Sequence, residues 1–278
     1  MPDVCHSSVV ALKRPAVQST GNSAVRIAFA LQAWAASAPG LSTTEQWLDW
    51  ARAPWLPHGT SAPDLSRFPA LMRRRLGSLG RLTVAVADAV MPSGDVSGIP
   101  VVWTSRYGDV GRSLELLFEQ ARQQPLSPTA FSLSVHNAIG AQHSIARQMR
   151  ANAVCVAGGA CSAEAGVLEA VSLLHDGASE VILVCHDAPL PGAYDRFEDG
   201  AACEYAWALR LSLQPSADER QIVLEMTQAQ EATEPDARTD DAALLPHGLQ
   251  VLRFLLTGEG RWRVPHARGA WTWSHGHA

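Results

Sequence analysis

The sequence predicts an α/β domain in which helices pack on a mixed β-sheet. Residues 153–187 contain an apolar strand segment, a small-residue turn, a helix and a second apolar strand segment in succession. Residues 201–213 and 221–228 alternate apolar and polar side chains, which indicates two strands, predicted to form an antiparallel pair at the sheet edge. The 278 residues are 47% hydrophobic and 18% charged, so the chain is predicted to be a soluble globular protein with one large core or two small ones.

The N-terminal region contains an arm and an apolar segment. Residues 1–22 lack apolar periodicity and are predicted to form a flexible arm. Residues 27–38 follow basic residues and end in small ones, as in a secretory signal peptide, but Gln32 interrupts the apolar run. We therefore interpret this stretch as part of the domain, and no segment is long enough to span a membrane.

Two helices are predicted before residue 90. Ser42, Thr43, Thr44 and Glu45 provide capping residues for a short helix that contains Trp47, Leu48 and Trp50. Residues 56–64 form a Pro/Gly loop, and residues 68–90 are predicted as a longer helix interrupted by Gly77 and Gly80.

A strand and a helix follow. Residues 98–105 are predicted as a strand and residues 109–123 as a helix, whose Leu114, Leu117 and Phe118 are expected to face inward. Arg106 and Asp109 flank the end of the strand, where a structural ion pair is expected. Within residues 153–187, Val167, Ala170, Val171 and Leu174 share one helix face, Gly177 ends that helix, and residues 179–187 form a buried strand.

The C-terminal region divides into a linker and an extension. Residues 230–243 are acidic and poor in apolar side chains, which predicts a flexible linker between a domain at 23–229 and residues 244–278. A final helix is predicted at 249–256, followed by a Gly/Arg-rich tail with Trp262, Trp271 and Trp273. His275 and His277 are expected to be solvated rather than to bind a metal ion.

The string Ser-Pro-Thr-x-Phe-Ser-x-Ser-Val-His-Asn at 127–137, with residues 103–109 and 158–177, resembles the N-terminal half of the β-ketoacyl synthases. These are thiolase-like condensing enzymes of fatty acid and polyketide assembly. The similarity is closest to short synthase-like proteins of type II polyketide and aryl polyene systems, relatives of chain-length factors. It implies a layered, thiolase-like (half-ketosynthase) fold with a C-terminal extension, in which residues 27–38 form the first core strand.

The resemblance also assigns the nucleophile position. Active synthases have a cysteine on the turn before the helix, and the ungapped match places Ala160 there, with Cys161 one residue beyond. A one-residue slip would place Cys161 at that position. Active members also use two histidines from their second half, and His58 lies on the wrong side of the turn to be one of them, so we interpret residues 58–60 as a loop.

Two further sets of residues have expected roles. The resemblance places Phe131, Ser134, His136 and Asn137 at a subunit interface, with Ser134 pointing towards the partner's acyl tunnel. The alternative is that His136 and Asn137 cap a helix and satisfy buried backbone groups. Arg73, Arg74 and Arg75 form either a dock for an acidic acyl carrier protein or a solvated face with internal ion pairs.

Charge and cysteine content exclude several classes. A net charge of −5 and a pI near 6.0 argue against nucleic acid as the main partner. The five cysteines, at positions 5, 155, 161, 185 and 203, show no metal-binding spacing, so we expect no metal, no cofactor and a reducing cytoplasm.

The function we predict is a non-catalytic, chain-length-factor-like subunit that pairs with an active β-ketoacyl synthase and shapes its acyl tunnel. The pathway would be polyketide, aryl polyene or fatty-acid-like biosynthesis. Half a fold should leave a large apolar face for a partner to cover. Two alternatives stay open: an acyltransferase or condensing enzyme that uses Cys161, and a stand-alone module that binds acyl carrier protein or acyl-CoA.

Overall fold

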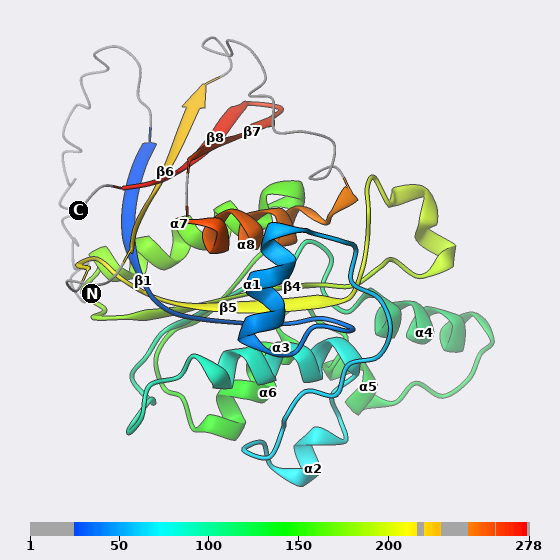
Figure 1. The fold of residues 1–278 in the computed structure, drawn as a ribbon. Helices are drawn as coiled ribbons and strands as arrows, with labels where there is room; N and C mark the ends of the chain where they lie inside the picture. Colours follow the sequence, from blue (N-terminus) through cyan, green and yellow to red (C-terminus); the bar gives the residue numbers. More distant parts are fainter. Residues whose placement is uncertain (1–24, 216–219, 229–243, 259, 277–278) are drawn as a thin grey trace, which may run out of the picture.

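The computed structural model describes residues 25–215, 220–228, 244–258 and 260–276, and their strands form one mixed sheet (Figure 1). The strand order is β3-β2-β4-β5-β1-β6-β8-β7. The parallel part consists of β3 (Ala153–Val156), β2 (Val101–Thr104) and β4 (Val181–Asp187), and the antiparallel part begins at β5 (Tyr205–Ser212). The predicted mixed sheet is therefore confirmed.

The first strand, β1 (Val25–Ser37), joins two parts of the sheet. Its C-terminal half pairs with β5 and its N-terminal half with β6 (Arg220–Gln228), and the register shifts between Leu31 and Ala33. Strands β5 and β6 were predicted as an antiparallel pair at the edge, and that pairing is wrong because β1 lies between them. A strand of 13 residues is long enough to pair with both.

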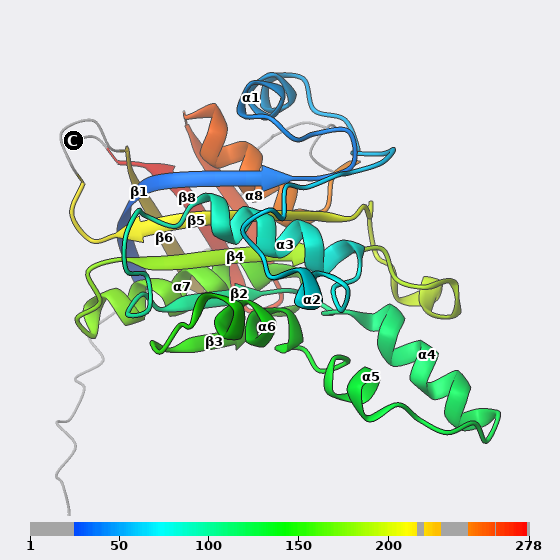
Figure 2. The same cartoon turned by 90° about the horizontal axis from the view of Figure 1, so that it is seen from below.

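Helices cover both faces of the sheet (Figures 1 and 2). Helices α3 (Ser78–Ala89) and α6 (Ala138–Arg147) lie on one face, and α7 (Ser162–His175) and α8 (His247–Thr257) lie on the other. The predicted apolar face of α7 is confirmed: all four of its residues are at most 2% exposed.

Helix α1 (Thr44–Arg52) begins where the capping residues predicted it. Thr43 is the N-cap, and its side chain and that of Gln46 accept hydrogen bonds from each other's backbone N–H groups. Trp47 donates from Nε1 to the carbonyl of Ala36 at 2.9 Å, which ties the helix to the end of β1.

The long helix predicted at 68–90 is two helices, α2 (Ala70–Arg73) and α3. Gly77 is the N-cap of α3 and has an extended backbone (ψ −179°), so the helical path cannot continue through it. Only Arg73 of the three consecutive arginines is helical.

The predicted C-terminal tail is also wrong, because β7 (Arg261–His266) and β8 (Gly269–His275) form a hairpin that pairs with β6. Trp271 and Trp273 alternate along β8, the period of a strand. Trp273 and Trp262 pack on Phe254 of α8, with ring centroids 6.2 and 6.0 Å away. Helix α8 and this hairpin cover the face of α7 that we expected to be open.

The exposed apolar surface lies elsewhere, on α4 (Val110–Ala121) and α5 (Pro128–Ser132), which project from the body of the molecule (Figure 2). Leu117 and Phe118 are 51% and 47% exposed, so the inward orientation predicted for them is wrong. Helix α4 packs against α5 rather than on the sheet, and Leu116 is its one buried residue. We call this surface the α4–α5 patch; it consists of Leu117, Phe118, Leu126, Phe131 and Val135.

Several predictions fall outside the described residues, namely the arm at 1–22, the acidic linker at 230–243 and His277. Within the described residues, no helix combines the length and apolar character needed to cross a membrane.

Candidate functional site

The turn between β3 and α7 has the predicted strand–turn–helix form. A single 3₁₀ turn, η1 (Gly159–Cys161), leads into the helix. Gly159 has φ +61°, a backbone region that favours glycine. Ser162 closes the turn, since its Oγ accepts from the N–H of Gly158 at 3.1 Å and donates to the carbonyl of Gly159 at 2.8 Å.

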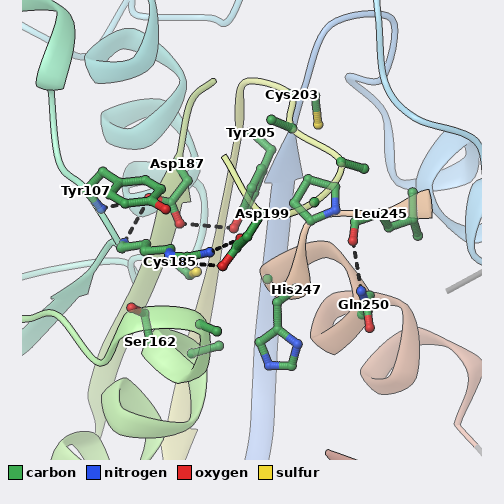
Figure 3. A pocket seen from close by; sticks show the side chains of 18 of the residues that line it. Tyr107, Ser162, Cys185, Asp187, Asp199, Cys203, Tyr205, Leu245, His247 and Gln250 are labelled. Atoms are coloured by element: carbon green, nitrogen blue, oxygen red, sulfur yellow. Dashed lines mark hydrogen bonds and ion pairs between the residues drawn. The ribbon is translucent and has the colours of Figure 1, made fainter. Parts of the chain in front are cut away.

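This turn forms one wall of a cavity of about 310 Å³ (Figure 3). The other walls come from β4 and β5 with the loop between them, and from the start of α8. Ala160 lines the cavity, whereas Cys161 is not among the lining residues and packs against the main core. The ungapped register, with Ala160 at the nucleophile position, therefore matches the geometry better than the slipped register does.

The Cys161 thiol is half-buried and lacks an activating environment. Burial, together with the nearby Glu164 carboxylate, raises the pKa of Cys161 to about 11. A thiol becomes nucleophilic as the thiolate, so these surroundings oppose the reactivity that an acyltransferase would need.

We therefore expect Cys161 to be alkylated by iodoacetamide at pH 7 no faster than a model thiol, because only about one molecule in 10⁴ would hold the thiolate at a pKa near 11. Peptide-level mass spectrometry of the native protein measures the rate at Cys161 itself. Alkylation about tenfold faster than a model thiol, abolished in a Cys161→Ser variant, would favour the enzyme interpretation.

Asp187, at the end of β4, is the most densely hydrogen-bonded side chain at the cavity (Figure 3). Its Oδ1 accepts from Ser105 Oγ at 2.8 Å and from the backbone N–H of Arg106 at 2.8 Å, and its Oδ2 accepts from the Tyr205 hydroxyl at 3.3 Å. Burial raises the pKa of Asp187, against the effect of these hydrogen bonds.

Arg106 pairs with Asp199 through two 2.6 Å contacts and not with Asp109, as we had expected. Asp109 instead caps α4, where its Oδ1 accepts from the N–H of Arg112 at 3.3 Å. A loop segment about 90 residues away in sequence therefore competes successfully for Arg106. The hydrogen bonds from Arg106 lower the pKa of Asp199, so the pair stays charged.

A second polar cluster joins α7 to the C-terminal segment. Glu164 is fully buried, and its Oε1 accepts from His247 Nε2 at 2.8 Å and from Trp273 Nε1 at 3.0 Å. The partners are 83 and 109 residues away in sequence, so local patterns did not reveal the cluster. A glutamate within an apolar helix was the available signal, because a buried carboxylate needs partners.

The lining charges restrict what the cavity can hold. Arg106 is neutralised by Asp199, while Glu198 and Asp187 also line the cavity. Such walls disfavour an anionic ligand. Within the part of the chain that the structure describes, no three His, Cys, Asp or Glu side chains lie close enough together to hold a metal ion.

Comparison with known families gives a decisive match. Residues 47–274 match the family model described as β-ketoacyl synthase, N-terminal domain. The chain belongs to this family. The predicted thiolase-like fold is confirmed, and a search of curated protein sequences found no significant match.

Solved synthase structures resemble this family member to different extents. A chain in the ketosynthase (ApeO) in complex with its chain length factor (ApeC) from Xenorhabdus doucetiae is 29% identical with a TM-score of 0.72, over 89% of this chain and 99% of that one. A β-ketoacyl synthase from Burkholderia phymatum is 14% identical with a TM-score of 0.56, over 75% of this chain and 66% of that one. The ishigamide ketosynthase/chain length factor is 14% identical with a TM-score of 0.55, over 74% and 68%. The last two matches show the fold alone.

The residues predicted for the interface lie apart from the cavity, on the segment that joins α5 to α6. Phe131 is 64% exposed, and Ser134 is half-buried with its Oγ donating to the carbonyl of Phe131 at 2.8 Å. Asn137 is the N-cap of α6, but its side chain makes no capping hydrogen bond. His136 donates from Nε2 to the carbonyl of Ser105 at 3.1 Å, so it does satisfy a backbone group.

The three arginines predicted for carrier-protein docking differ in environment. Arg74 and Arg75 are exposed, whereas Arg73 is half-buried and donates weakly to the carbonyl of Leu65 at 3.4 Å. His58 is exposed in the predicted loop between α1 and α2.

Proposed function

We propose that this protein is a non-catalytic, chain-length-factor-like subunit that pairs with an active β-ketoacyl synthase. One observation carries the proposal: Ala160, not Cys161, lines the cavity beside the helix α7 turn, where active family members have their nucleophile. A methyl side chain cannot form the acyl-enzyme. The raised pKa of Cys161 also argues against a substitute nucleophile one residue away.

The extent of the structural matches supports this role. The match covers 99% of a chain in the ketosynthase–chain length factor complex, but only 66% of the Burkholderia synthase. This protein thus matches a short chain from a two-subunit complex almost end to end. We infer that it works in such a complex, in the cytoplasm.

The surface also supports a partner. Strand β3 lies at the end of the sheet order and pairs only with β2 in the described part of the chain, so its outer backbone edge is available. Helix α6 packs beside β3, and the segment that precedes α6 leads to the exposed α4–α5 patch. Exposed apolar side chains that gather on one projection are typical of a protein interface.

The proposed reaction context is chain elongation by the partner. The synthase would supply the nucleophile and act on chains bound to an acyl carrier protein, in polyketide, aryl polyene or fatty-acid-like biosynthesis. The exposed Arg74 and Arg75 are the candidates for contact with the acidic carrier protein, and they would mainly raise its association rate.

A test with product length as readout uses the complex of this protein with the ketosynthase encoded nearby. We expect Ser134→Phe to shorten the products, because added volume on the α5–α6 segment would close the partner's acyl tunnel earlier. Overpacking costs about 1–3 kcal/mol, which a large interface tolerates. Ser134→Gly should assemble normally and lengthen the products or leave them unchanged.

Ser132→Phe is the matched control, since Ser132 is an exposed serine two residues away whose Oγ donates to the carbonyl of Thr129 at 2.9 Å. It should leave product length unchanged. If Ser134→Phe assembles and product length does not change, the tunnel-closing role is wrong.

A further inference from the structure

The loop from Ser105 to Gly108, here called the connector loop, joins β2 to α4 and is held by one buried carboxyl group. Asp187 accepts from Ser105 Oγ at 2.8 Å, from the N–H of Arg106 at 2.8 Å and from the N–H of Tyr107 at 3.4 Å. The guanidinium of Arg106 is occupied by Asp199, so the bonds to Asp187 come from the loop and from Tyr205. Hydrogen bonds to a buried carboxylate are stronger than those between neutral groups.

On one side, the connector loop holds the cavity wall. Arg106 binds both carboxylate oxygens of Asp199, and the Tyr107 hydroxyl donates to the carbonyl of Phe197 at 3.2 Å. These bonds secure the segment that contains the 3₁₀ helix η2 (Gly192–Phe197) and Asp199, which lies on the cavity (Figure 3).

On its other side, the connector loop seats the partner-facing segment, residues 131–137. The carbonyl of Ser105 accepts from His136 Nε2–H at 3.1 Å, and Ser105 Oγ accepts from the N–H of Gly108 at 2.8 Å. Gly108 has φ +68°, and a Cβ there would lie 3.2 Å from His136 Cδ2, so the His136 ring packs directly on the loop.

We propose that Asp187 is a positioning residue that fixes the partner-facing segment through the connector loop, and thereby sets where Ser134 and His136 meet the synthase. The role of the segment in the complex rests on the proposed function. The contacts from Asp187 to Ser105 and from Ser105 to His136 stand on their own. A carboxyl group on the cavity wall thus controls the geometry of a surface that does not line the cavity.

Hydrogen–deuterium exchange of the isolated protein tests the positioning role. We expect Asp187→Ala to speed amide exchange about tenfold or more both in the connector loop and in residues 131–138, the loss expected for one or two hydrogen bonds to a charged group. It should also shift the ¹⁵N resonance of His136 Nε2. Asp187→Asn should retain most of the protection, because its amide oxygen can still accept from the loop.

Asp199→Ala is the matched control, because it removes an aspartate from the same loop's contacts but only at the cavity wall. It should speed exchange in residues 192–199 and leave residues 131–138 unchanged. Exchange in residues 131–138 that is unaffected by Asp187→Ala would overturn the proposal. If Asp187→Ala does not fold, Ser105→Ala decides, since it removes the Oγ contacts to Asp187 and Gly108 and should give the same pattern.

Product analysis of the complex separates this inference from the proposed function. Faster exchange together with altered product length supports both. Faster exchange with unchanged products and normal assembly supports the positioning by Asp187 and counts against the tunnel role of the segment. Unchanged exchange rejects the positioning role, whatever the products of the complex are.

Discussion

Replacing Phe131 by Asp is expected to abolish the complex with the ketosynthase while leaving the fold of this protein intact. The Phe131 side chain is 64% exposed on α5, so it contributes little to the core of the isolated chain. Truncation of a central aromatic side chain in an interface costs about 2–4 kcal/mol, and a buried, unpaired carboxylate adds to this. The dissociation constant should rise about 30-fold to 1,000-fold or more.

The measurement is titration calorimetry or co-elution with the purified synthase, together with a thermal unfolding curve for each variant. Leu244→Asp is the matched control: Leu244 is 63% exposed, and it lies just before α8 on the opposite side of the sheet (Figure 1). This control should bind as the unmodified protein does. Normal binding by Phe131→Asp would move the interface away from the α4–α5 patch.

Acidification is expected to destabilise this protein through His186. The ring is 2% exposed, and in the described part of the chain neither of its nitrogens has a hydrogen-bond partner. Burial, and to a lesser extent the charge of His136, lowers the pKa of His186 from 6.5 to about 3. The folded state therefore binds fewer protons than the unfolded state between about pH 6.5 and pH 3, and stability falls as the pH falls through that window.

Between pH 7 and pH 5 the His186 contribution to the free energy of unfolding should fall by about 2 kcal/mol. A His186→Leu variant of similar volume should lose this dependence and be at least as stable at pH 7, because it buries no polar nitrogen. Urea unfolding at both pH values measures the difference. The raised pKa of Asp187 acts in the opposite direction, but it is common to both proteins and cancels in the comparison. An equal loss in the leucine variant would assign the pH dependence to other groups.

Local sequence patterns determined most of the elements of this protein. The spacing of Val167, Ala170, Val171 and Leu174 placed a helix with one buried face, and Thr43 placed the start of α1. These patterns act over a few residues, because a helix turn or a capping bond involves close neighbours in the chain. The family motifs and the position of Ala160 could also be read from the sequence.

The tertiary structure alone decided how the elements meet. Strand β1 separates β5 from β6, the predicted tail becomes a hairpin that covers α7, and Leu117 and Phe118 face solvent. The site contacts follow the same rule, because Arg106 finds Asp199 and Glu164 finds His247 across more than 80 residues in both cases. Apolar periodicity shows that a face will be buried, but not against which element. That choice depends on the packing of the whole chain, which residue spacing does not encode.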